Sequence, residues 1–273
     1  MAKNLLVDMN DVQFVLYEML KVHDLAHFEK FNGYDREILQ DTLNLAEKIA
    51  WDKMYPVDSQ GDEEGVSYDP KTMSVTVPEY FHEPYRSMTG AGFISISDSA
   101  DFGGMGMPQS VSVACKEFFG AASAALSFCA LLTGSAAGLI RRFGTEEQKI
   151  LYLDKMLKGI WGGTMCLTEP GAGSDVGNMR TRAIPTPDGS YHIEGQKIFI
   201  SSGEHNLTEN IIHMVLARIE GAPSGTRGLS LFIVPKYLVD PDGSLAGRNG
   251  VFCRGVEKKM GFHGSPTCAL SFG

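Results

Sequence analysis

The sequence predicts an α+β fold, with an all-helical N-terminal domain over residues 1–160 and an antiparallel β-barrel or sandwich domain over residues 161–273. Three observations support this prediction. The 273 residues exceed the usual size of one domain. Apolar residues make up 43% and charged residues 21%, a balance that can bury a large core. The spacing of apolar residues changes from helical to strand-like near Ile160.

The first third of the chain is predicted to be helical, after an N-terminal extension of about residues 1–30. Residues 35–53 form the clearest helix, because their apolar residues recur on one face: Ile38, Leu39, Leu43, Ala46, Ile49 and Ala50. The acidic, glycine-flanked residues 60–65 are predicted to be a surface loop. Residues 78–90 are predicted to form a short helix entered through Pro78.

A long apolar helix is predicted from about Gln109, and residues 118–140 within it carry no charge. That length raises the question of a membrane span. We favour a buried helix, because the segment consists mostly of Ala, Gly, Ser and Thr, which allow close helix packing. Residues 145–148, Thr-Glu-Glu-Gln, form a capping box for another helix, with Ile150, Leu153 and Leu157 as its buried stripe and Gly159 as its stop.

The second part of the chain alternates strand-like runs with turn signals. YHIEGQKIFIS, NIIHMVLARIE, GLSLFIVPKYL and TCALSF are separated by segments such as PTPDGS and GAPSGTRG. Asp188-Gly189 is a strong hairpin turn. Regular short strands of this kind predict antiparallel pairing.

Composition limits the classes of function. The net charge of −9 disfavours a nucleic-acid binder, which needs a basic face. Five widely spaced cysteines with no CxxC pair predict buried, reduced thiols in a cytoplasmic protein. The N-terminus lacks the features of a secretory signal. The seven histidines form no pair with metal-ligand spacing, so no metal is assigned.

The stretch TMCLTEPGAGSDVG, residues 164–177, carries the first chemical signal. Its glycine spacing is neither the dinucleotide-binding fingerprint nor a Walker loop. Free backbone N–H groups and the hydroxyls of Thr168 and Ser174 could bind a polar ring edge or a phosphate. The alternative is a glycine-rich turn in which Glu169 and Asp175 are solvated acids or caps.

The second signal is GQKIFISSGEHN, residues 195–206, where a strand bearing Phe199 ends in Ser201, Ser202 and Gly203. An aromatic residue on a strand is normally part of the core, and Ser-Ser-Gly is normally a turn. Each motif alone is weak. Both together, about thirty residues apart, are specific.

These two motifs resemble the acyl-CoA dehydrogenase family of flavoproteins. FGTEEQKILYLDKMLKG, TRGLSLFIVPK and VEKKMGFHGSPTCALSF extend the resemblance over essentially the whole chain. It is strongest to the long branch that includes methylmercaptopropionyl-CoA dehydrogenases. The family fold adds a C-terminal helical bundle that is absent here, and the abrupt ending TCALSFG favours a chain that is part of a longer protein.

The resemblance implies that FAD lies across the β-domain. The residues it places at the cofactor are Met165, Leu167, Thr168, Gly173, Ser174, Phe199, Ile200 and Ser201, with Ser174 also at the thioester substrate. Many relatives carry Tyr at the position of Met165 and Trp-Ile-Thr at 199–201. Phe and Ser retain a flat apolar surface and a hydroxyl donor, so we expect FAD contact with altered stacking.

The resemblance further implies α,β-dehydrogenation of acyl-CoA thioesters, with electrons passed to an electron-transfer flavoprotein and a homodimer or homotetramer at full length. The family's catalytic glutamate comes from the C-terminal bundle, so no catalytic residue is assigned, and Glu169 is not interpreted as the base. This portion alone is expected to be inactive. The alternatives are an acyl-CoA oxidase, a DNA-associated alkylation-response relative and a flavin-free scaffold.

Overall fold

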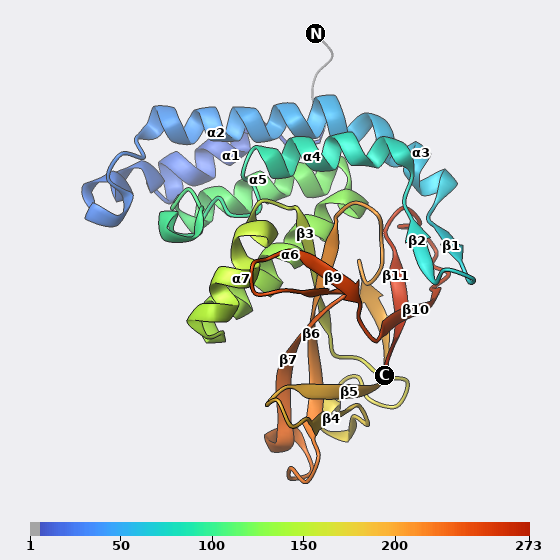
Figure 1. Cartoon of the computed structure of the whole chain (residues 1–273). Helices are drawn as coiled ribbons and strands as arrows, with labels where there is room; N and C mark the ends of the chain where they lie inside the picture. Colours follow the sequence, from blue (N-terminus) through green and yellow to red (C-terminus); the bar gives the residue numbers. More distant parts are fainter. Residues whose placement is uncertain (1–5) are drawn as a thin grey trace.

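The computed structural model describes residues 6–273 and shows a layer of helices above a curled β-sheet (Figure 1). Residues 1–5 of the predicted N-terminal extension lie outside the described residues. The helices are α1 (Met9–Gln13), α2 (Arg36–Ile49), α3 (Tyr55–Glu64), α4 (His82–Gly90), α5 (Gln109–Ala122), α6 (Ala124–Phe143) and α7 (Glu146–Leu157). Shorter 3-10 and π turns connect several of them.

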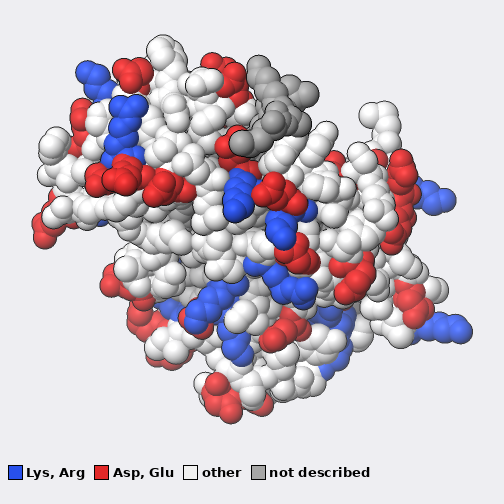
Figure 2. All heavy atoms as spheres, turned by 90° about the horizontal axis from the view of Figure 1, so that it is seen from above, with Lys and Arg blue, Asp and Glu red and all other residues white. Residues whose placement is uncertain are grey.

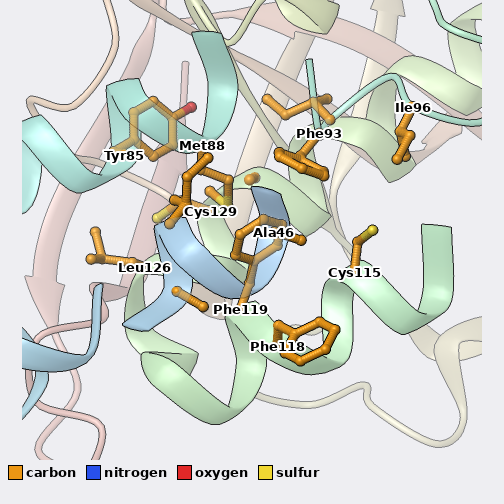
Figure 3. Close-up of a cluster of buried hydrophobic side chains, with 14 of the residues drawn as sticks. Ala46, Tyr85, Met88, Phe93, Ile96, Cys115, Phe118, Phe119, Leu126 and Cys129 are labelled. Carbon is orange, nitrogen blue, oxygen red and sulfur yellow. The ribbon is translucent and has the colours of Figure 1, made fainter. Parts of the chain in front are cut away.

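The core of the helical layer is apolar and is drawn from several helices. Figure 3 shows Phe118 and Phe119 of α5 converging with Leu126 of α6 and with Tyr85 and other residues of α4. Phe119 packs edge-on against Phe93, with ring centroids 4.8 Å apart. The face of α2 predicted from its spacing is buried at Leu39, Leu43, Ala46 and Ile49, and Ala50 just after the helix is buried as well. Ile38, predicted on the same face, is 41% exposed, so the prediction is confirmed except at that residue.

Three details of the helical prediction were wrong. Residues 60–65 continue α3 to Glu64 and stop at Gly65, so the predicted loop is a helix end. The long apolar helix is two helices, because Ser123 caps α6 by accepting a hydrogen bond from the Leu126 N–H. Ile150 is 81% exposed, whereas Leu153 and Leu157 are buried. The capping box of α7 is present, and Gly159 follows with φ +70°.

The β-domain has seven strands in one mixed sheet. Its strands are β3 (Trp161–Cys166), β4 (Arg182–Pro185), β5 (Tyr191–Ser201), β6 (Asn210–Ile219), β7 (Leu229–Pro235), β10 (Val251–Val256) and β11 (Thr267–Phe272). They follow the order β10-β11-β5-β4-β6-β3, with β7 on β6. The strands β8 (Tyr237–Val239) and β9 (Leu245–Arg248) form a separate hairpin.

Helices followed by a β-domain confirm the predicted fold class, but the sheet is not purely antiparallel. Strand β6 runs parallel to both β3 and β4. Long connections separate these partners in the sequence, and alternation of apolar residues does not distinguish parallel from antiparallel neighbours. The turn at Asp188-Gly189 does join antiparallel β4 and β5.

The first 160 residues are not entirely helical. Strands β1 (Ser67–Asp69) and β2 (Ser74–Thr76) form a hairpin that packs on the β-domain. The Tyr68 hydroxyl donates to the Cys253 carbonyl at 3.1 Å. A three-residue strand is too short to produce a periodic signal, which is why the sequence did not reveal it.

Helix α6 joins the two parts of the molecule. The Gly163 N–H on β3 donates to the Thr133 hydroxyl on α6 at 3.0 Å. A side chain at Gly163 would meet the Ala136 Cβ at 2.8 Å, so the glycine allows close packing of helix on strand. By length and composition α6 could cross a membrane. We interpret it as a core helix, because its small residues form this contact.

All five cysteines are buried and free.

Candidate functional site

The structure brings the two chemical motifs together at the seam of the curled sheet. Strands β3 and β5 are separated in the sheet by β4 and β6. Even so, the Ile198 N–H on β5 donates to the Thr168 carbonyl just after β3, at 2.9 Å. The Lys197 ammonium on β5 donates to the Leu167 carbonyl, also at 2.9 Å. We call residues 165–168 and 199–201 together the ledge.

A β-bulge shapes the β5 side of the ledge. Lys197 pairs with Leu270 and Ile200 with Cys268, so the register shifts by one residue between them. This shift reverses the alternation of the strand. Ile200 is therefore buried beside Cys268, and Phe199, with φ +59°, is 57% exposed. An exposed aromatic in the left-handed region carries backbone strain, which is typical of functional sites.

The β3 side of the ledge is partly buried and polar. Met165 lies opposite Met214 on β6, and Met165, Leu167 and Thr168 are all half-buried. Ser201, on the facing segment, is half-buried as well. The hydroxyls of Thr168 and Ser201 have no hydrogen-bond partner among residues 6–273. They are therefore available to a ligand.

The glycine loop after the ledge has no internal reason to lack side chains. Gly171 and Gly173 have no left-handed φ, and an added Cβ meets nothing within 4 Å at Gly171 and only Thr168 at 3.8 Å at Gly173. Within residues 6–273, the N–H groups of Gly173 and Ser174 find no acceptor. Both residues are exposed. Bare backbone with free donors suits close contact with an external group.

Glu169 is not the solvated acid of the alternative interpretation. Its carboxylate is buried and accepts hydrogen bonds from the N–H groups of Arg180 and Thr181 and from the Lys197 ammonium at 2.9 Å. Burial alone would raise the pKa of Glu169, but these hydrogen bonds together hold it below its usual value. Because three donors already hold this carboxylate, we interpret Glu169 as a structural group and not as the catalytic base.

Sequence reasoning missed Lys197, whose side chain is 0% exposed. The sequence did contain a signal for it. Lys197 is four residues from Ile193, so it lies on the same face of the strand, and Ile193 is buried in the β-domain core. A lysine at an inward position requires a partner. Burial lowers the pKa of Lys197, and the charge and hydrogen bond of Glu169 oppose that effect.

A second buried cluster follows the ledge in the sequence. Glu204 is ion-paired to Lys236 and to Arg248, the latter at 3.0 Å. Two residues before Glu204, Ser202 shares a 2.9 Å hydrogen bond with the Cys129 thiol of α6. The end of β5 is thereby tied both to the β-domain and to the helical layer.

A cavity of about 290 Å3 opens between α4, α5 and α6. One part of its wall is aromatic and aliphatic, with Phe93, Ile94, Phe119, Phe128 and Leu131, and the rest is polar, with Asp98, Gln109, Lys116 and Arg141. Phe128 precedes Cys129, the contact of Ser202, and packs edge-on against Phe262 at 5.3 Å. One turn of α6 therefore connects the cavity to Ser202, the residue directly after the ledge.

The described residues hold no candidate metal-ligand cluster, and no basic patch stands out on the face seen in Figure 2. Residues 6–273 contain no group of three or more His, Cys, Asp or Glu residues that could hold a metal ion. On the face seen in Figure 2, Lys and Arg side chains are interspersed with Asp and Glu. The ledge and the cavity are therefore the features to explain.

Helices, curled sheet and ledge define the N-terminal and middle domains of an acyl-CoA dehydrogenase. Residues 61–160 match the family model for the N-terminal domain, and residues 164–273 match the model for the middle domain. The chain belongs to the acyl-CoA dehydrogenase family.

Its relatives are longer than this chain. It is 37% identical to 3-methylmercaptopropionyl-CoA dehydrogenase of Ruegeria pomeroyi over 262 residues. The aligned region is 96% of this chain and 44% of the relative. Butyryl-CoA dehydrogenase of Megasphaera elsdenii superposes with a TM-score of 0.70 at 28% identity, over 88% of this chain and 56% of that one. An acyl-CoA dehydrogenase of Bacillus anthracis, solved with FAD, shares the fold with a TM-score of 0.68 at 23% identity, over 89% of this chain and 36% of that one.

Proposed function

We propose that this chain forms the FAD- and thioester-binding portion of an acyl-CoA dehydrogenase that removes hydrogen across the α,β bond of an acyl-CoA. The observation that carries the proposal is the hydrogen bond from Ile198 to Thr168, which places the two motifs side by side. Family membership supports the same reaction. So does the relative solved with FAD, whose fold this chain shares.

The residues at the ledge fit a flavin. Phe199 offers an exposed flat surface, and Thr168 and Ser201 offer free hydroxyls to a polar ring edge. Ile200 is buried, so it contacts the cofactor only through its backbone. Gly173 and Ser174 offer N–H donors where cofactor and thioester meet. When bound, FAD supplies the acceptor for the hydride that leaves the β-carbon.

The other half of the reaction, removal of the α-proton, needs a base that this chain does not provide at the ledge. Glu169 is the nearest acid in the sequence, and its carboxylate is already occupied by three donors. We therefore place the base outside residues 6–273. Free N–H groups around Gly173 could meanwhile stabilise negative charge on the thioester oxygen.

The acyl group is assigned to the cavity between α4, α5 and α6. The aromatic and aliphatic part of its wall suits a hydrocarbon chain, and Cys129, next to Phe128 in that wall, contacts Ser202 directly after the ledge. The volume of about 290 Å3 accommodates a short or medium acyl chain more readily than a long one.

Titration of the purified chain with FAD, followed by quenching of flavin fluorescence, tests this proposal. We expect saturable binding that weakens at least about tenfold in Gly173→Val, because a side chain there occupies the space of the ligand. The matched control is Gly247→Val on the β8–β9 hairpin, where an added Cβ meets nothing within 4 Å; at Gly173 it meets only Thr168, at an ordinary contact distance of 3.8 Å. Equal affinity in both variants would remove the glycine loop from the site.

Two further measurements address catalysis. With FAD and an acyl-CoA but no additional protein, we expect no bleaching of the flavin; bleaching at enzymatic rates would place the base within this chain. The proposed electron acceptor is an electron-transfer flavoprotein. Chemically reduced, FAD-loaded chain should be reoxidised faster by that flavoprotein than by oxygen, and rapid peroxide formation would favour an oxidase instead.

A further inference from the structure

We propose that Lys197 and Glu169 are positioning residues that fix the separation between the two segments of the ledge. This inference rests on the proposed function for its catalytic meaning, but the geometry can be tested without a cofactor. Neither side chain faces a ligand, because they are 0% and 6% exposed. They act through the backbone that they hold.

Lys197 links β5 to the residues that follow β3. Its ammonium donates to the Leu167 carbonyl and to the Glu169 carboxylate, each at 2.9 Å, and lies 3.8 Å from the Met179 sulfur. Leu167 belongs to one segment of the ledge, and Lys197 lies two residues before Phe199, which begins the other. One side chain therefore spans the seam.

Glu169 extends this link into the glycine loop. Its two oxygens accept from the N–H groups of Arg180 and Thr181, beyond the loop, while its own backbone pairs with Ala172 in both directions, at 2.8 and 3.2 Å. The carboxylate thus clamps the start and the end of residues 169–181. Gly173 and Ser174 lie between these ends, and the Arg218 guanidinium on β6 holds the far side of the loop by donating to the Gly177 carbonyl at 2.8 Å.

The seam depends on this pair because little else crosses it. Strands β3 and β5 are not neighbours in the sheet, so no ladder joins them directly. Within residues 6–273, the one backbone hydrogen bond between the ledge segments and their flanks runs from Ile198 to Thr168. A bulge next to this bond makes the strand locally irregular. A buried ion pair with good hydrogen bonds provides the missing rigidity.

The test compares two buried lysines. Lys197→Met removes the link across the seam, and Lys236→Met removes a similarly buried lysine whose partner, Glu204, lies outside the ledge. Both variants should lower Tm. Only Lys197→Met should lower the hydrogen-exchange protection of the Ile198 amide relative to neighbouring β5 amides, by about tenfold or more, and weaken FAD binding about tenfold, the effect of losing one charged hydrogen bond.

Glu169→Asp is the second variant, in case Lys197→Met does not fold. It keeps the charge but is one methylene shorter, so it cannot reach Lys197 and both N–H groups together; we expect the same changes, smaller in size. The inference is overturned if Ile198 exchanges equally in the Lys197→Met and Lys236→Met variants, or if Glu169→Asp matches the wild type in both measurements. Absence of FAD binding in the wild type would refute the proposed function, whereas the Ile198 comparison would still decide the positioning role.

Discussion

The helical layer and the β-domain bury different kinds of side chain. Among the described residues before Trp161, the buried polar side chains belong only to Ser and Thr, namely Thr89, Ser95, Ser112, Ser123 and Thr133. The β-domain buries ionisable groups: Glu169, Lys197, Glu204, His205, His213 and Lys236. Burying a charge costs free energy unless the charge is paired. The location of these groups in the β-domain therefore needs a structural reason.

The difference indicates that the two parts have different tasks. Apolar packing in the helical layer holds α5 and α6 around a cavity, and it tolerates small adjustments of side chains. Of the buried charges in the β-domain, Glu169 and Lys197 lie next to the ledge, where two strand ends must meet in one geometry. Directional interactions specify such a geometry better than apolar contacts do.

The largest expected effect on the free energy of unfolding comes from removing the buried carboxylate of Glu204 in the β-domain. Glu204→Gln leaves Lys236 and Arg248 close together without a carboxylate, and we expect a loss of about 3–5 kcal/mol in the free energy of unfolding. Chemical denaturation measures it. The control is Glu194→Gln in the exposed pair with Arg182, where the expected loss is at most about 1 kcal/mol. Equal losses in the two variants would contradict the comparison.

The helical layer was largely predictable because periodicity and capping are local signals. The buried face of α2 and the capping box of α7 follow from neighbouring residues alone. Ile150 was misplaced because the chain's own spacing does not say which side of a surface helix meets the core. The parallel β3–β6 pair depends on contacts distant in sequence, and local patterns carry no information about it.

The site was predictable in outline only. The two motifs identified the ledge, and the structure brings Thr168 and Ile198 into hydrogen-bond contact. The buried pair of Glu169 and Lys197 was not predicted, because charged residues are ordinarily expected at the surface. The bulge that exposes Phe199 and buries Ile200 arises where β5 pairs with β11. Because β11 is distant in the sequence, the exposure of these two residues could not be predicted from β5 alone.

The second expected effect is a dependence of stability on pH that arises from two buried histidines of the β-domain. Burial, and then the charge of Lys236, lowers the pKa of both His205 and His213 to about 3. Since the unfolded pKa is about 6.5, the unfolded state binds more protons between these values. Stability is fully present above pH 6.5 and falls as pH decreases, by about 2 kcal/mol per histidine at pH 5.

The measurement for this effect is the slope of unfolding free energy against pH between 6.5 and 5. His213→Gln should make that slope shallower, whatever its effect on absolute stability. The control is His192→Gln on β5, whose side chain is about half exposed and should leave the slope unchanged. An unaltered slope in His213→Gln would show that His213 is not buried in its neutral form.

The smallest effect contrasts two glycines on either side of the contact between α6 and β3. An added Cβ at Gly138, within α6, meets nothing within 4 Å, so Gly138→Ala should stabilise the protein by about 0.5–1 kcal/mol through helix propensity. At Gly163 the same methyl group lies 2.8 Å from the Ala136 Cβ, and Gly163→Ala should destabilise by about 1–3 kcal/mol. Thermal unfolding compares the two. Destabilisation by both variants would contradict this contrast. It would mean that a position of α6 with open space around it tolerates an added methyl group no better than the close contact between α6 and β3 does.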